Sequence, residues 1–94
     1  MKGREIVKTI MEKTNVSNAQ LAHRLGVTIA TMWDRINSKK VKDIPLSTLN
    51  EMVRALDYKI VVVPASKQVK DDEYLVTNEK YDLDELLGKK EESK

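Results

Sequence analysis

The chain has 94 residues, with 17 lysines and arginines, 15 aspartates and glutamates, one histidine and no cysteine. This length allows one small domain with a single core, and the composition excludes disulfides, thiolate metal sites and multi-histidine metal sites, so we expect no metal and no cofactor. Because the longest apolar run, residues 60–63, is far shorter than the roughly 20 residues of a membrane helix, we expect a soluble, cytoplasmic protein with no membrane contact.

The charge is unevenly distributed. Residues 1–64 contain eleven basic and six acidic side chains, a net charge of +5, whereas residues 65–94 contain six and nine, a net charge of −3. A basic body followed by an acidic tail is compatible with a polyanionic partner for the body.

The first predicted helix covers residues 3–13, where apolar residues recur at the spacing of one helical face. A second, short helix begins after Ser17, which forms a capping-box pattern with Gln20, and ends at Gly26. Thr28 is a candidate N-cap for a third helix, whose apolar residues are Ile29, Met32, Trp33 and Ile36.

A polar loop over residues 38–45 separates the third helix from a fourth, which we expect to begin near Pro45 and to reach Leu56. The β-favouring run YKIVVV follows at residues 58–63, and residues 73–77 are a candidate second strand. A short helix beginning at Asp82 and ending at Gly88 is predicted in the tail. The fold class is therefore mainly α, with a helical domain at 1–57, a strand or hairpin segment at 58–77 and an acidic tail at 78–94.

Two short helices joined by a short, glycine-containing turn are the pattern of a helix-turn-helix. The segment VSNAQLAHRLGVTIATMWDRINSKK, residues 16–40, resembles the helix-turn-helix of the lambda-repressor and Cro-like (XRE-type) DNA-binding proteins. The resemblance covers about residues 3–57. It implies that the third helix enters the major groove of double-stranded DNA while the second lies across the backbone. One departure is that this family usually buries the position of Arg35, whereas here the apolar residue is Ile36.

The resemblance also implies the residues of a DNA interface. By position, Asn18 would contact phosphate, and Thr28, Ile29, Ala30 and Asp34 would point toward base edges. Chemically, Thr31 can bond a base or phosphate and Arg35 can reach guanine, while Lys39, Lys40 and Lys42 suit phosphate contacts.

Two of these side chains have alternative interpretations. Asp34 either accepts from cytosine N4 or forms a salt bridge with Arg35 or a neighbouring lysine, and Trp33 is favoured as a partly buried core residue over a DNA contact. His23 is expected to be an exposed surface residue, and no catalytic constellation accompanies it, so we do not expect an enzyme.

An apolar strand must pair with another strand, because its backbone groups and edge are otherwise unsatisfied. Residues 58–63 can pair with residues 73–77 of the same chain or with the same segment of a second copy. The second arrangement provides the two-fold axis that two half-sites require, and Cro-like repressors and some antitoxins have a dimerising strand after the helical domain. The expected dimerisation residues are Tyr58, Ile60, Val61, Val62 and Val63.

The sequence thus predicts a sequence-specific DNA-binding regulator, a homodimeric repressor of a palindromic operator. The alternative is an antitoxin or another protein-binding inhibitor whose acidic C-terminal tail binds a protein partner. A helical domain that binds only protein is a third interpretation, since a fold does not prove a function.

Overall fold

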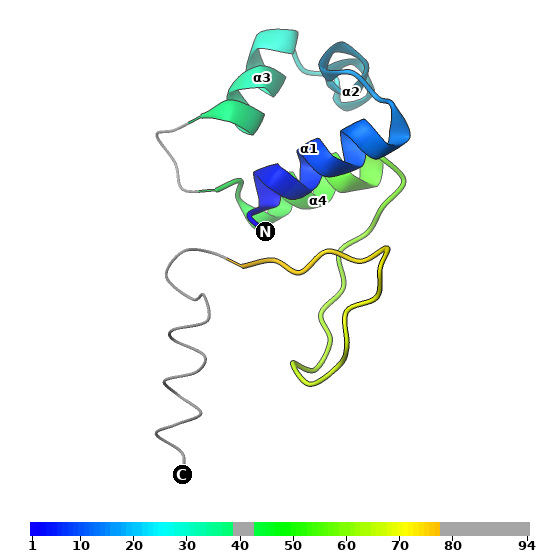
Figure 1. The fold of residues 1–94 in the computed structure, drawn as a ribbon. Helices are drawn as coiled ribbons and strands as arrows, with labels where there is room; N and C mark the ends of the chain where they lie inside the picture. Colours follow the sequence, from blue (N-terminus) through cyan, green and yellow to red (C-terminus); the bar gives the residue numbers. More distant parts are fainter. Residues whose placement is uncertain (39–42, 78–94) are drawn as a thin grey trace.

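The computed structural model describes residues 1–38 and 43–77. The four helices in this part of the chain are α1 (Gly3–Thr14), α2 (Asn18–Leu25), α3 (Ile29–Asn37) and α4 (Leu46–Ala55). α1 and α2 each pack against both α3 and α4 (Figure 1). The four helices predicted for residues 1–57 are therefore confirmed.

Local hydrogen bonds define the starts of α2 and α3. The Ser17 hydroxyl accepts from the Gln20 N–H at 3.1 Å, and the Ser17 N–H donates to the Gln20 side chain at 2.8 Å, which completes the predicted capping box. The Thr28 hydroxyl accepts from the Thr31 N–H at 3.0 Å and caps α3. Both helices begin where their capping residues predicted.

Two helices end on a residue in the left-handed backbone region, Asn15 after α1 and Gly26 after α2, with φ of 57° and 69°. Asn tolerates this conformation better than most residues, and glycine adopts it without steric cost. A Cβ on Gly26 would have no other atom within 4 Å, so backbone conformation alone favours glycine in this turn. The predicted end of the second helix at Gly26 is confirmed.

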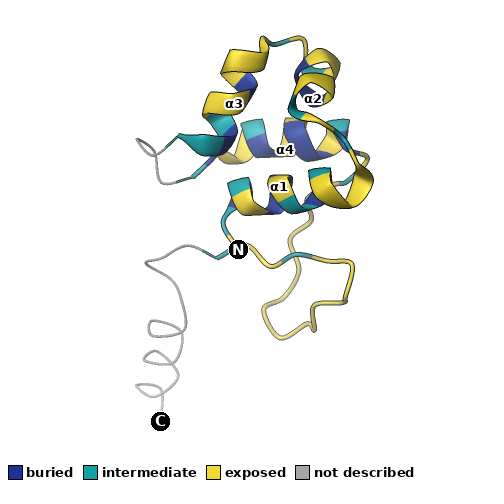
Figure 2. Cartoon of the chain, turned by 45° about the horizontal axis from the view of Figure 1, so that its top comes forward, coloured by how far each residue is buried: buried dark blue, intermediate teal, exposed yellow. Residues whose placement is uncertain are grey.

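The core lies between the four helices (Figure 2). On α3 it contains Met32 and Ile36, which are 0% and 4% exposed, while Arg35 is only half-buried. The departure from the family pattern is therefore observed, because Ile36 and not Arg35 is the second buried residue of α3. The buried residues are Ile6, Val7, Ile10, Leu21, Ala22, Met32, Ile36, Ile44, Leu49, Met52, Val53 and Leu56.

The structure corrects the prediction of a strand after the helices. Residues 58–77 form no strand and run as an irregular segment away from α4 and back beneath α1 (Figure 1). A strand requires a neighbour with which its backbone can pair, and within the single chain residues 58–63 do not pair with residues 73–77. The hairpin alternative is therefore wrong, and the predicted helix from Asp82 to Gly88 lies outside the described residues.

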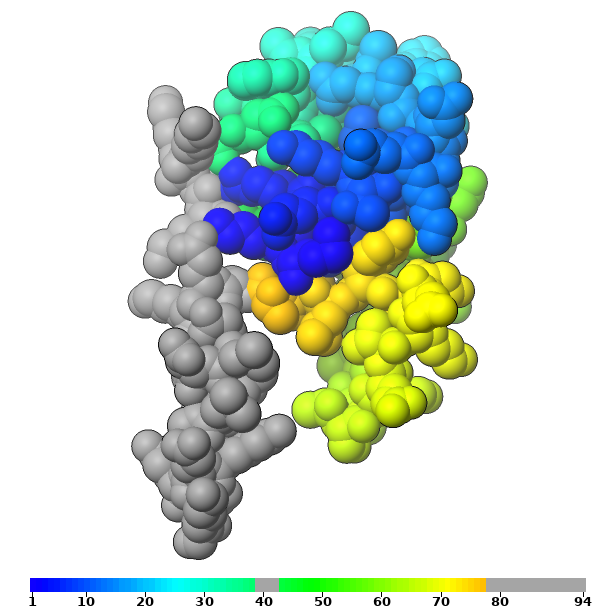
Figure 3. All heavy atoms as spheres, in the orientation of Figure 1, coloured from blue at the N-terminus to red at the C-terminus, as the bar shows by residue number. Residues whose placement is uncertain are grey.

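Side chains hold the returning segment against the helical domain. Tyr58, Ile60 and Tyr74 pack against the core, and the rings of the two tyrosines lie 6.4 Å apart. The returning chain also meets the N-terminus, where the Thr77 N–H donates to the Met1 carbonyl at 2.9 Å (Figure 3). Val61, Val62 and Val63 have no such packing and are 63%, 96% and 50% exposed.

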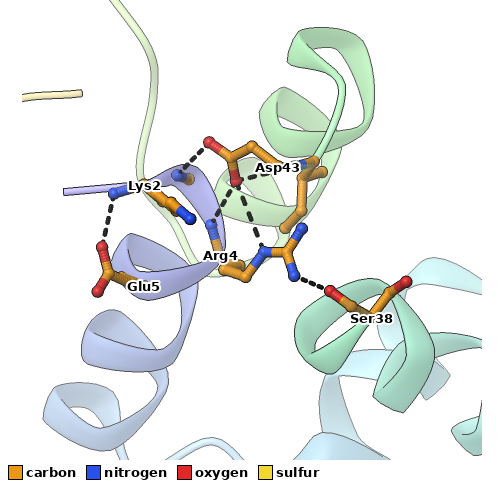
Figure 4. A network of polar contacts seen from close by, with 7 residues as sticks. Lys2, Arg4, Glu5, Ser38 and Asp43 are labelled. Carbon is orange, nitrogen blue, oxygen red and sulfur yellow. Dashed lines mark hydrogen bonds and ion pairs between the residues drawn. The ribbon is translucent and has the colours of Figure 1, made fainter. Parts of the chain in front are cut away.

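Asp43 ties the chain before α4 to the start of α1 (Figure 4). Its carboxylate accepts hydrogen bonds from the N–H groups of Gly3 at 2.7 Å and Arg4 at 3.1 Å, two of the donors that a helix start leaves unpaired. It also accepts from the Ile44 N–H at 2.8 Å and lies 3.9 Å from the Arg4 Nε. Arg4 in turn donates to the Ser38 carbonyl, so α1 holds both flanks of residues 39–42.

The environment of Asp43 perturbs its pKa. Partial burial opposes ionisation, but the hydrogen bonds from the N–H groups of Gly3, Ile44 and Arg4, with the Arg4 charge, outweigh burial and lower the pKa below its ordinary value of 3.8. Gly3 permits this close approach, because a Cβ there would lie 3.2 and 3.3 Å from the two carboxylate oxygens. The ionised form of Asp43 is therefore stabilised by folding.

Replacing Asp43 by alanine should lower the free energy of unfolding at pH 7 by about 2 kcal/mol, because three N–H groups and Arg4 lose a charged partner. The pKa of Asp43 is depressed on folding, so its contribution is complete well above pH 3.8 and is lost as pH falls through the lower folded-state pKa. Urea unfolding at pH 7 and pH 3 measures both effects. The exposed Asp71→Ala is the control, and an equal loss for the two variants at pH 7 would contradict the capping role.

Candidate nucleic-acid interface

α2 and α3 form the helix-turn-helix, joined by the three residues Gly26, Val27 and Thr28. The Val27 N–H donates to the Ala22 carbonyl at 3.0 Å, which closes the turn, and the Val27 side chain packs against the core. At the other end, the Asn18 side-chain amide lies 3.5 Å from the Ile29 carbonyl, so the start of α2 contacts the start of α3. The two helices are thereby held as one unit.

The first turns of α3 present their side chains to solvent. Thr28, Ile29, Ala30, Thr31 and Asp34 are all exposed. The hydroxyls of Thr28 and Thr31 lie 2.9 Å apart and hydrogen-bond to each other, so each is already oriented by the cap of the helix. The predicted base-reading residues therefore share an accessible surface, which we call the α3 face.

Asp34 forms no ion pair with Arg35 among the described residues, so that alternative is not observed. Arg35 is half-buried, and its Nη1 is shielded from solvent without a hydrogen-bond partner in the described part of the chain. The lysine partners that the sequence offers for Asp34, at positions 39, 40 and 42, lie outside the described residues. Asp34 thus has an exposed carboxylate on the α3 face.

Trp33 is 59% exposed, and the expectation that it is a partly buried core residue is wrong. Met32 and Ile36 occupy the buried side of α3, and each residue of an α-helix is rotated by about 100° from its neighbour. Trp33 is consequently turned away from the core, toward the flank of the helix. The sequence signal for this position of Trp33 was the apolar residue at position 36, where the related family has one at position 35.

An open groove of about 850 Å³ lies beside Trp33, between α1, α2 and α3. Met11, Val16 and Ile36 supply its apolar lining. Its other lining residues are polar or charged, apart from Trp33 itself: Lys8, Glu12, Asn15, Ser17, Asn18, Gln20 and Asn37. Of these residues, the sequence pattern singled out only Asn18 as a DNA contact. It missed Lys8, because no local pattern reveals that α1 contributes to this groove.

Two other polar side chains of α2 have positions that bear on the predictions. His23 is exposed, as expected, and the described residues contain no cluster of three His, Cys, Asp or Glu side chains that could hold a metal ion. Arg24 donates from Nη1 to the Ala55 carbonyl at 2.9 Å, at the end of α4, which is a structural contact.

The described helices include none with the length and apolarity needed to cross a membrane.

Comparison with known families agrees with this geometry. Residues 2–38, which contain α1, α2 and α3, match a family model described as winged helix-turn-helix DNA-binding. No curated protein and no solved structure matches the chain. The match and the arrangement of α2 and α3 together support a helix-turn-helix DNA-binding domain in the first part of the chain.

Proposed function

We propose that this protein is a sequence-specific DNA-binding transcriptional regulator of the lambda-repressor/Cro-like type, a homodimeric repressor of a palindromic operator. The observation that carries the proposal is the α3 face, where small, apolar and acidic side chains are exposed at the start of the second helix of a helix-turn-helix. In such a motif this part of the helix reads base edges in the major groove.

The type of helix-turn-helix is inferred from the next element of the chain after α3. A winged domain continues into a β-hairpin, whereas here the next element is α4, which packs against α1 and α2, and the described residues contain no strand. A fourth helix closing the core is the arrangement that the lambda-repressor-like resemblance implies. The family match ends at residue 38 and therefore does not include α4.

The chemistry of the α3 face suggests how DNA is read. Ile29 and Ala30 offer apolar contacts to thymine methyl groups, Thr31 offers a hydroxyl, and Asp34 is an acceptor for cytosine N4. Asn18 at the start of α2 would contact phosphate, as would Lys39 and Lys40. Arg35 can reach guanine only by leaving its half-buried position.

Dimerisation through residues 58–63 is supported by their exposure. Val61, Val62 and Val63 are all at least half exposed, and they lie in an apolar run that has no partner strand in its own chain. Antiparallel pairing with the same run of a second copy would satisfy the backbone and bury the valines, while Tyr58 and Ile60 stay against their own core. The two-fold axis would relate two α3 faces.

Selection of bound sequences from random duplex DNA tests the proposal. We expect a palindromic consensus with half-sites about one helical turn, roughly 34 Å, apart. Log affinity for the consensus duplex should fall linearly with log salt concentration, by about 0.9 per phosphate neutralised. Absence of binding to any duplex, or binding that does not respond to salt, would refute DNA recognition, and a non-palindromic consensus would refute the dimeric repressor.

A further inference from the structure

We propose that Trp33 is a DNA-binding residue, packing its indole against the deoxyribose of a strand whose adjacent phosphate lies in the groove between α1, α2 and α3. The inference rests on the proposed function and extends the interface beyond the α3 face. The exposure of Trp33, its neighbours on α3 and the chemistry of the groove beside it carry the argument.

Trp33 exposes more apolar surface than the fold requires. At 59% exposure it lies one helical turn after Ile29, which is 57% exposed, so the two large side chains share one flank of α3. An exposed apolar flank beside a recognition surface is a feature of binding sites.

The side chains that line the groove beside Trp33 are complementary to a nucleic-acid backbone. Lys8, Asn18 and Asn37 line it from three different helices, and Glu12 is its one carboxylate among the described residues. The Asn18 and Asn37 amides each donate one N–H to a backbone carbonyl of α3, at 3.5 and 3.0 Å, and each has a second N–H to offer a ligand. A DNA strand alternates an anionic phosphate, which takes such donors, with a sugar that presents an apolar face. Donors beside an exposed indole match this alternation.

The position of the groove also fits a strand at the edge of the major groove. Asn18, already implied as a phosphate contact, lines it, and the Asn18 amide lies 3.5 Å from the carbonyl of Ile29 on the α3 face. A strand that flanks bases read by Ile29 and Ala30 would therefore pass the start of α2. Trp33 adjoins both, because it lines the groove and lies one turn after Ile29 of the α3 face.

The tryptophan is the only one in the chain, so its fluorescence reports this site directly. We would titrate the full-length protein with the duplex selected from random DNA and monitor both tryptophan emission and the anisotropy of labelled duplex. We expect emission to change with the same midpoint as anisotropy. Trp33→Ala should weaken binding by roughly tenfold to a hundredfold, whereas Trp33→Phe, which keeps an aromatic face, should retain most of the affinity.

Leu75→Ala is the matched control, because Leu75 is 60% exposed and belongs to the segment beneath α1, on the side opposite α2 and α3 (Figure 1). It should bind as the wild type does. If duplex binds with unchanged emission, or if Trp33→Ala binds as tightly as the wild type, the inference is overturned and the proposed function stands. If the wild type binds no duplex, the proposed function itself fails. Should Trp33→Ala not fold, the emission titration still decides.

Discussion

Replacement of Val62 by aspartate is expected to yield a folded monomer whose affinity for a palindromic duplex falls by about a hundredfold or more. Val62 is 96% exposed, so folding of the single chain does not depend on it. In an antiparallel pair of identical runs, an aspartate at this position would be brought into the apolar seam between the two copies, where removing its charge from water is costly. The loss arises because two half-sites are then bound by independent molecules.

Val62→Thr is the control, since threonine is β-branched and uncharged and should preserve pairing. Sedimentation measures the oligomeric state, circular dichroism confirms folding, and a duplex with a single half-site should bind the aspartate variant and the wild type equally. Persistent dimers of the aspartate variant would show that another surface holds the copies together. Ile60 is a poorer choice, because its side chain packs against the core of its own chain.

Replacement of Asp34 by alanine is expected to relax sequence preference at one base pair by about 1–3 kcal/mol, a factor of roughly 5 to 150. The exposed carboxylate can accept from cytosine N4, and discrimination against other bases at that position depends on it. Binding to unrelated duplexes should become slightly tighter, because a negative charge near the phosphates is removed.

Competition between the consensus duplex and duplexes with single substitutions measures the change at each position. Lys40→Ala is the matched control, for which we expect weaker binding to every duplex and a smaller salt dependence, without altered preference. An Asp34→Ala variant that keeps the wild-type preference would remove Asp34 from the reading residues. If Lys40→Ala instead changed preference, the division between reading and positioning contacts would be wrong.

Much of the helical fold could be predicted because its signals are local. Ser17 with Gln20, Thr28 and Gly26 act on backbone groups within a few residues, and all three capping or turn contacts are present. Of the four apolar residues at helical spacing in α3, Met32 and Ile36 are buried, whereas Ile29 and Trp33 are exposed. A cap or a helical period depends little on the rest of the chain, so the sequence is sufficient to reveal it.

The candidate site could be predicted only in part. Exposure of Thr28, Ala30, Thr31 and Asp34 is expected from the period of α3, and it is observed. The groove could not be foreseen, because Lys8, Asn18 and Asn37 come from three helices and meet only after these pack. The same holds for Asp43, whose carboxylate satisfies N–H groups forty residues earlier in the chain.

By itself, the sequence determined the four helices of residues 1–57, the glycine turn and the resemblance to a helix-turn-helix, since capping and apolar periodicity are properties of neighbouring residues. Tertiary structure alone decided that residues 58–63 do not pair within their chain and that the groove beside Trp33 gathers polar side chains from three helices. The physical reason is that β-favouring residues show only that a segment can form a strand. Whether it pairs, and which side chains become neighbours, depends on the distant segments that fold against it.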